Sequence, residues 1–251
     1  MTKDIELAPA YFMPLTALAS FPRSGNTWTR SLLQIATKYH TSTVYWETEG
    51  KHEVLRIWFK GGIENYTLRK GVCVKTHKFN VEHIASFDNG AILLIRNPYH
   101  SIISEFMRIY NRLRNVSHPE IIQFLRDNDE RWPKEFHRQS KNWRSTSLNW
   151  IKHCKRLMIV YYEDLTENPV RELTRMVAFL DQPIKPNRIQ CAVYNYKPMA
   201  SKEHKSQMDF DPYTPDMYKA LDGFITEVNE TLIKKNAIPL PTYEKYRLSS
   251  K

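Results

Sequence analysis

The residues best suited to chemistry in this sequence are Lys75, Thr76 and His77, which follow a short run of apolar and β-branched residues. A histidine, whose intrinsic pKa lies near neutrality, can take a proton from a hydroxyl or an amine. In an extended chain, Lys75 lies on the same side as His77 and can neutralise charge that builds on a departing phosphate. The alternative is that His77 is a hydrogen-bonded turn residue and Lys75 a solvated charge.

A polar loop, Arg23–Thr27 (RSGNT), could bind such a phosphate. It lies between a predicted buried strand over Leu15–Ser20 and a predicted helix that begins near Trp28. A strand, a tight loop and a helix start direct free backbone N–H groups and the positive end of the helix dipole at an anion. The alternative is an ordinary β-turn before a capped helix, because Ser, Asn and Thr are favoured caps.

Four predicted strands must position these residues. They span Leu15–Ser20, Gly71–Thr76, Ala91–Ile95 and Leu157–Tyr161, and predicted helices separate them. This alternation predicts an α/β fold in which a parallel sheet is flanked by helices on both faces. Ligands of such sheets bind at the carboxyl ends of the strands. The Arg23 loop, the Lys75–His77 segment, Arg96 and Tyr162 each follow a strand, so we expect them to gather at one edge.

A predicted helix follows Arg96, with Asn97 as its cap and Pro98 at its first position. Its apolar side carries Ile102, Ile103, Phe106 and Tyr110, and its polar side carries Ser101, Ser104 and Arg108. Ser104 is therefore expected to be free to contact a ligand outside the core.

Length and charge leave several classes of protein open. The 251 residues are most simply a single domain, 1–251, and the formal charge of +10 favours anionic ligands. Trp132, Trp143 and Trp150 stand among basic residues, so they could stack on bases in a nucleic-acid-binding module, or anchor the core. A P-loop kinase is disfavoured, because Gly50-Lys51 has Tyr45 at the position of the first glycine. We expect no nucleic-acid partner.

The remaining composition bears on metal and location. There is no HExxH, CxxC or carboxylate cluster, so no metal is expected. Cys73, Cys154 and Cys191 are predicted to be buried, reduced thiols. No apolar stretch is long enough to span a bilayer, and no signal peptide is visible, which predicts a cytoplasmic protein. Glycosylation triplets at Asn65, Asn115 and Asn229 favour the Golgi lumen instead if a membrane anchor precedes this chain.

Four motifs in order resemble the 3′-phosphoadenosine 5′-phosphosulfate (PAPS)-dependent sulfotransferases. They are the loop RSGNTW from Arg23, the Lys-Thr-His triplet, Arg96 with Ser104 eight positions later, and the Tyr-Glu-Asp-Leu segment from Tyr162. Arg23 stands where cytosolic members have Lys, and Asn26 where many have Thr. The resemblance covers the chain from about Leu15 to Leu180, and it implies a P-loop-like sulfotransferase fold. The residues of these motifs are more similar to those of the sulfotransferase domains of animal WSC-domain proteins than to those of the cytosolic drug-metabolising enzymes.

The resemblance implies a PAPS donor, a PAP (adenosine 3′,5′-bisphosphate) product, and a small-molecule or glycan acceptor with a hydroxyl or amine. It implies catalytic roles for His77, Lys75 and Arg23. It departs from this sequence at one point, since cytosolic members have an Arg-Lys-Gly loop near the C-terminus that this chain lacks. Lys202 and Lys205 are the expected replacements. The full set of residues expected to bind the nucleotide is Arg23, Ser24, Gly25, Asn26, Thr27, Trp28, Arg96, Ser104, Tyr162, Lys202 and Lys205.

Overall fold

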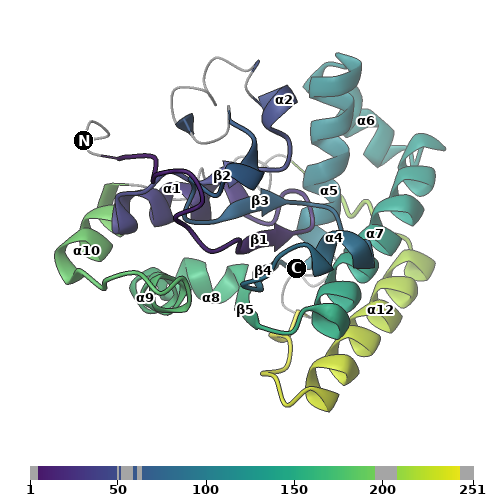
Figure 1. The fold of residues 1–251 in the computed structure, drawn as a ribbon. Coiled ribbons are helices and arrows are strands. Elements are labelled where there is room, and N and C mark those ends of the chain that lie inside the picture. Colours follow the sequence, from purple (N-terminus) through teal and green to yellow (C-terminus); the bar gives the residue numbers. More distant parts are fainter. Residues whose placement is uncertain (1–4, 50, 52–58, 61–63, 196–207, 244–251) are drawn as a thin grey trace.

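A five-stranded, wholly parallel sheet forms the centre of the protein in the computed structural model, which describes residues 5–49, 51, 59–60, 64–195 and 208–243 (Figure 1). The strand order is β2-β3-β1-β4-β5. The strands are β1 (Ala17–Ser20), β2 (Ser42–Thr43), β3 (Val74–Thr76), β4 (Ala91–Ile95) and β5 (Leu157–Tyr161). The carboxyl ends of β1, β3, β4 and β5 therefore lie along one edge, as the alternation of strands and helices predicts.

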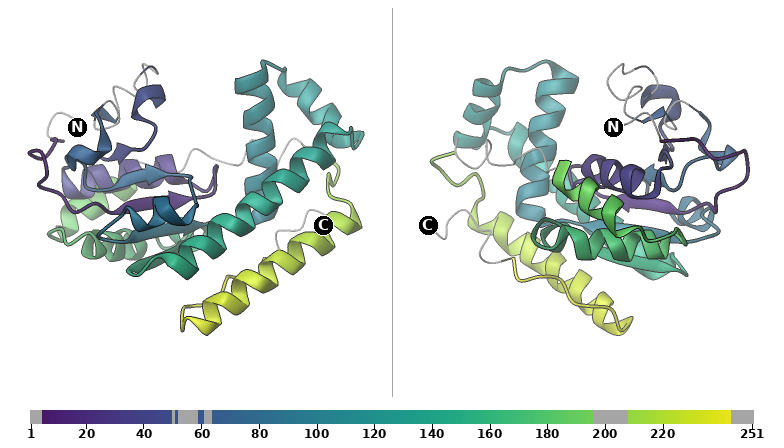
Figure 2. Two further views of the ribbon diagram at one scale, coloured as in Figure 1. Left: turned by 45° about the vertical axis from the view of Figure 1, so that its right-hand side comes forward. Right: turned by 90° about the vertical axis from the view of Figure 1, so that its left-hand side faces the viewer.

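Helices cover both faces of this sheet, which confirms the predicted α/β fold. Along β1, Ala17 and Ala19 belong to one apolar cluster and Leu18 to the other. The first cluster lies under α5 (Pro98–Arg108), α7 (Arg131–His153) and α12 (Pro215–Lys234). The second lies under α1 (Asn26–Thr37), α9 (Pro169–Phe179) and α10 (Pro186–Asn195). Figure 2 shows α7 and α12 running side by side beyond the sheet.

Shorter elements connect these layers. They are α2 (Trp46–Glu49), the 3₁₀ turn η2 (Tyr66–Leu68), α4 (Val81–Ala85), the π-helical turn η3 (Ile109–Leu113), α6 (His118–Arg126) and α8 (Tyr162–Glu167). Within the described ranges, no helix is both long and apolar enough to span a membrane. The same residues contain no group of three or more His, Cys, Asp or Glu side chains that could hold a metal ion.

The predicted strands agree with the structure except at the starts of β1 and β3. β4 and β5 have the predicted bounds, whereas β1 begins two residues after Leu15 and β3 three residues after Gly71. Gly71 lies against Ser42, where an added Cβ would be 2.6 Å from the Ser42 backbone nitrogen. The strand β2 was not predicted, because its two residues are polar and pair with β3 alone.

The three tryptophans of the basic segment are core residues, so of the two alternatives the core-anchor interpretation is correct and the stacking surface is excluded. Trp132, Trp143 and Trp150 are each 0% exposed. The Trp143 indole donates to the Arg96 carbonyl at 2.9 Å, and that of Trp150 to the Lys78 carbonyl at 3.1 Å. These two bonds fix the chain immediately after β4 and β3. The tryptophans therefore support the edge of the sheet at which the polar motifs lie.

One prediction for α5 needs correction. Asn97 caps the helix by accepting from the Tyr99 amide at 2.8 Å, as expected. Ser101, however, is fully buried instead of facing outward, and its hydroxyl bonds weakly to the Pro98 carbonyl at 3.5 Å. Ser104, one turn later, is partly exposed.

The cysteines are free thiols, but the prediction that all are buried holds only for Cys73, because Cys154 and Cys191 are partly exposed. Cys73 is fully buried, and burial raises its pKa to about 12. A thiol that stays protonated is a poor nucleophile and a poor metal ligand. Cys73 is therefore a small core residue.

Candidate functional site

The polar loop after β1 has the backbone conformation of a tight turn. Arg23 has φ +64° and Gly25 has φ +91°, both in the left-handed region, and α1 begins at the next residue. The Asn26 amide donates to the Leu18 carbonyl at 3.0 Å and to the Ser20 hydroxyl at 3.2 Å, so the start of α1 is tied to β1. Gly25, the cap of α1, has no side chain that could accept from the first amides of this helix, so these amides are available to an anion.

Residues from three other segments meet this loop directly. The Arg23 Nε donates to the Ser104 hydroxyl at 2.9 Å, across from α5. The Arg96 guanidinium, just past β4, donates to the Arg23 carbonyl at 2.7 Å. The same guanidinium lies 4.5 Å over the Tyr162 ring at the end of β5. The residues predicted to gather from distant parts of the sequence therefore form one contiguous cluster.

Gly25 allows the Tyr162 ring to lie directly against the loop. A Cβ at Gly25 would come 2.6 Å from the Tyr162 Cδ2 atom. The Trp28 ring meets Tyr162 edge-on, with centroids 6.1 Å apart. Two aromatic rings thus border the loop, which is the arrangement that a flat heterocycle such as a purine can contact.

Replacing Gly25 by alanine is expected to lower both the melting temperature and the affinity for an anionic nucleotide. The new Cβ would collide with Tyr162, and a left-handed φ costs a non-glycine residue about 1 kcal/mol or more. Gly223→Ala is the matched control, because nothing lies within 4 Å of a Cβ at Gly223, in the middle of α12. That variant should gain roughly 0.5–1 kcal/mol of stability. Thermal unfolding measures the stability of both variants. A Gly25 variant as stable as the Gly223 variant would contradict the geometry.

The loop holds buried polar atoms that fit a phosphate. Ser24 is fully buried and Arg96 nearly so. The Ser24 hydroxyl and the Arg96 Nε have no hydrogen-bond partner among the described residues. Buried polar groups without a partner are rare and costly, so they indicate a ligand that completes them. Phosphate oxygens of a nucleotide would accept from each of them.

The cluster is also strongly cationic. Although Arg23 is an exposed residue, partial desolvation and then the charge of Arg112 in η3 lower its pKa, while Glu105 raises it. Within the described part of the chain, Arg23, Arg96 and Arg112 form no ion pair with a carboxylate. Arg108 differs, because Glu105 binds it at 2.6 Å. Arginines therefore outnumber carboxylates in this cluster, and such an excess of positive charge indicates an anion site.

Arg112 was missed by sequence reasoning, although a signal for it exists. Ser104, Arg108 and Arg112 are four residues apart, the spacing of one helical face. The predicted helix included Ser104 and Arg108 on its polar side. Its continuation through the π-helical turn η3 could not be read from the sequence, because π-turns have no clear sequence pattern.

His77 stands next to this cluster in a defined tautomer. Its Nδ1 lies 2.8 Å from the Ser20 carbonyl, which can only accept, so Nδ1 carries the proton and Nε2 holds the free electron pair. The backbone N–H of His77 donates to the Tyr45 hydroxyl at 3.0 Å, and the two rings stack 5.9 Å apart. Burial, followed by the charge of Lys75, lowers the pKa of His77 to about 3. The imidazole is therefore neutral and able to accept a proton.

Ser20 joins the imidazole to the anion loop. Its carbonyl accepts from His77, and its hydroxyl accepts from Asn26, the first residue of α1. Ser20 is fully buried. A proton acceptor and an anion-binding loop thus share one residue at the end of β1.

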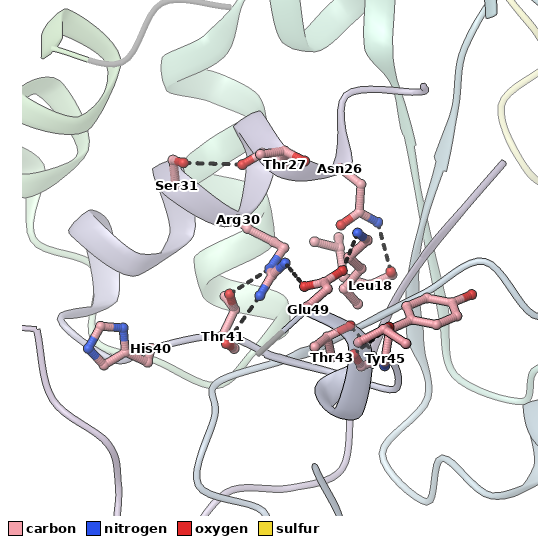
Figure 3. A network of polar contacts seen from close by, with 12 residues as sticks. Leu18, Asn26, Thr27, Arg30, Ser31, His40, Thr41, Thr43, Tyr45 and Glu49 are labelled. Carbon is pink, nitrogen blue, oxygen red and sulfur yellow. Dashed lines mark hydrogen bonds and ion pairs between the residues drawn. The ribbon is translucent and has the colours of Figure 1, made fainter. Parts of the chain in front are cut away.

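Lys75 is a buried ion-pair partner, which excludes its interpretation as a solvated charge. Its Nζ lies 2.5 Å from Glu49 Oε1, and the second oxygen of Glu49 lies 3.1 Å from Arg30 of α1 (Figure 3). Only 15% of the Lys75 side chain is exposed. Sequence reasoning found neither Glu49 nor Arg30, because both are separated from Lys75 in the sequence and no motif links them.

The structure thus brings together nearly all the residues predicted for the site. Lys202 and Lys205 lie outside the described residues. Ser24, Gly25, Asn26 and Thr27 form the loop and the first turn of α1. Arg23 opens the loop, and the residues next to it are Trp28, His77, Arg96, Ser104 and Tyr162. Lys75 lies beside His77 and is bound to Glu49.

Comparison with known proteins agrees with this arrangement. The profile described as "Sulfotransferase family" matches residues 88–186. WSCD family members of Drosophila melanogaster and Aedes aegypti are each 33% identical to this chain, over 218 and 219 residues. These alignments cover 86% and 87% of this chain. The chain spans 66% of the length of each relative.

A solved structure shares the fold. The crystal structure of mouse sulfotransferase SULT7A1 complexed with PAP has a TM-score of 0.54 and 16% sequence identity to this chain. The similarity covers 91% of this chain and 89% of the mouse chain. The parallel sheet, the motifs at its edge and the sequence relatives lead to one conclusion: this chain belongs to the sulfotransferase family.

Proposed function

We propose that the protein transfers the sulfuryl group of PAPS to a hydroxyl or amine of a small-molecule or glycan acceptor. The observation that carries this proposal is the joining, through Ser20, of the Arg23 loop and a neutral His77 whose Nε2 is unprotonated. Family membership supports sulfuryl transfer, and the PAP bound to the mouse sulfotransferase supports an adenosine bisphosphate as donor scaffold.

The donor would be held by the cluster around the loop. The amides of the loop and of the first turn of α1, with the Ser24 hydroxyl, suit the 5′-phosphate. Arg96 and Ser104 suit the 3′-phosphate, and both already bond to Arg23. Tyr162 and Trp28 offer their rings to adenine.

Bound PAPS supplies an electrophilic sulfur and a stable phosphate leaving group. The acceptor loses its proton to His77 Nε2 while its oxygen or nitrogen attacks sulfur. The bond from the acceptor to sulfur forms, the bond from sulfur to the 5′-phosphate oxygen breaks, and PAP retains the bonding electrons. Arg23, Lys75 and the loop amides stabilise the negative charge of that leaving phosphate.

His77 gains basicity when the donor binds. In the free protein its pKa of about 3 reflects burial and the nearby Lys75 charge. An anionic donor beside the imidazole favours the protonated form and raises this pKa. The base is therefore weak before the donor arrives and strengthened at the step that needs it.

Incubation with radiolabelled PAPS and a panel of phenols, alcohols, amines and sialylated glycans tests the proposal. We expect label to pass to at least one acceptor class. We also expect PAP at 100 times its dissociation constant to stabilise the folded protein by about 2.7 kcal/mol, seen as a rise in melting temperature. If calorimetry detects no association of PAP with the folded protein, the proposed function is wrong.

A further inference from the structure

The buried carboxylate of Glu49 contacts two cations at once. Its Oε1 lies 2.5 Å from Lys75 Nζ on β3, and its Oε2 lies 3.1 Å from Arg30 Nη1 on α1. Figure 3 shows Glu49 reaching from the short helix α2 to the Arg30 guanidinium. Glu49 therefore connects the loop after β2, the first helix and the strand that leads to His77.

Other contacts hold the Arg30 guanidinium in place, so Arg30 orients the Glu49 carboxylate. The Arg30 Nε donates to the Thr41 hydroxyl at 2.8 Å, and the guanidinium lies 3.9 Å over the Phe59 ring. Arg30 is fully buried. With Oε2 fixed by this arginine, Oε1 has one orientation, and Lys75 meets it there.

Lys75 needs this counter-ion because its surroundings oppose its charge. Burial lowers the pKa of Lys75, Glu49 raises it, and the positive charges of Arg30 and Arg108 lower it further. The neighbours without a fixed charge are Tyr45, whose ring centroid is 5.8 Å from Lys75 Nζ, and the neutral His77. Among the described groups that act on Lys75, Glu49 alone favours its charged form.

We propose that Glu49 is the positioning residue for Lys75: it fixes the ammonium at the end of β3 beside Tyr45 and His77 and keeps it charged for the donor phosphate. Glu49 is not placed to contact the reacting atoms and acts through Lys75. This inference rests on the proposed function, in which Lys75 neutralises the leaving phosphate.

The test measures PAP affinity by calorimetry from pH 6 to pH 9 for the wild type, Glu49→Gln and Glu47→Gln. Glu47 is the matched control, because it lies on the same short helix, is exposed, and loses the same charge. From pH 6 to pH 9, we expect the PAP affinity of Glu49→Gln to fall about tenfold further than that of the wild type or Glu47→Gln. This difference corresponds to one unit in the pKa of Lys75. Titrations in two buffers of different ionisation enthalpy should show proton uptake on PAP binding at pH 9 by Glu49→Gln alone.

Two further variants separate positioning from folding. Glu49→Asp keeps the charge, so its affinity should follow the pH dependence of the wild type even if it is weaker throughout. Lys75→Met removes the titrating group, and adding Glu49→Gln to it should cause no further pH-dependent loss. If Glu49→Gln does not fold, parallel affinity curves for Glu49→Asp and the wild type are the outcome that supports the inference.

The failures are distinguishable. If the wild type does not bind PAP, the proposed function itself is wrong. If the wild type binds PAP and Glu49→Gln follows the pH dependence of Glu47→Gln, only the positioning role is overturned. Equal losses for Glu49→Gln and Glu49→Asp at every pH would likewise overturn it, because they indicate a purely structural carboxylate.

Discussion

Replacing His77 by alanine is expected to slow sulfuryl transfer by about two to four orders of magnitude, the usual contribution of a positioned general base. Its unprotonated Nε2 is lost, while the loop that binds the nucleotide keeps its own contacts to β1 and α5. The affinity for PAP should therefore stay within a few-fold of the wild type. Steady-state turnover of the acceptor identified with labelled PAPS, together with calorimetry, measures the two quantities separately.

His83→Ala is the control for this variant. Burial also lowers the pKa of His83, to about 4. The His83 Nε2 lies 2.8 Å from the hydroxyl of Thr76, the last residue of β3 and the one before His77. It contacts neither the loop nor Ser20 in the contacts described above. Turnover by His83→Ala should remain near the wild-type value. A His77 variant that is as active as the His83 variant would show that another group takes the proton.

The pH dependence of the wild type gives an independent check on His77. For PAPS, kcat/KM reports the free enzyme, where the pKa of His77 is about 3, so its acid limb should lie well below pH 6.5. The kcat value reports the complex with donor, where added negative charge raises this pKa, so its acid limb should lie at higher pH. Since the folded pKa is below the unfolded value, stability that is present above pH 6.5 should fall as the pH drops below it.

Local patterns were sufficient to predict the elements that carry the site. β4 and β5 are continuous apolar runs that end at polar residues, and their bounds agree with the structure. A strand that ends in a polar loop predicts where a ligand can bind, because parallel strands place their carboxyl ends at one edge. That rule places the Arg23 loop, Arg96 and Tyr162 together without any knowledge of side-chain contacts.

The partners of these residues could not be predicted in the same way. Glu49 and Arg30 meet Lys75 because three segments pack against one another, and the pattern of charges in each segment does not reveal this contact. The tryptophans also show that a sequence pattern does not determine which side chains are buried. Their spacing among basic residues fits a stacking surface as well as a core, and only the burial of Trp143 and Trp150 decides between them.

Arg96→Ala is expected to weaken PAP binding about 10- to 150-fold, which corresponds to the roughly 1.5–3 kcal/mol of a hydrogen bond to a charged group. The variant removes the buried Nε that lacks a partner in the described structure, and it also releases the Arg23 carbonyl and the Tyr162 ring. Arg156→Ala is the matched control, because Arg156 likewise bonds to backbone carbonyls, of Asn89 and Phe179. Its guanidinium also covers a ring, 4.0 Å from the Phe179 centroid.

The two arginines lie at opposite ends of β5, so the comparison separates loss of ligand contact from loss of stability. Arg156 precedes β5 and Arg96 faces the Tyr162 ring that follows it. Arg156→Ala should lower the melting temperature but leave PAP affinity unchanged, whereas Arg96→Ala should lose affinity for PAP far more than for 5′-AMP. That difference is expected because 5′-AMP lacks the 3′-phosphate assigned to Arg96. Equal losses for both nucleotides would mean that Arg96 acts by supporting the Arg23 turn, and unchanged PAP affinity would remove Arg96 from the donor site.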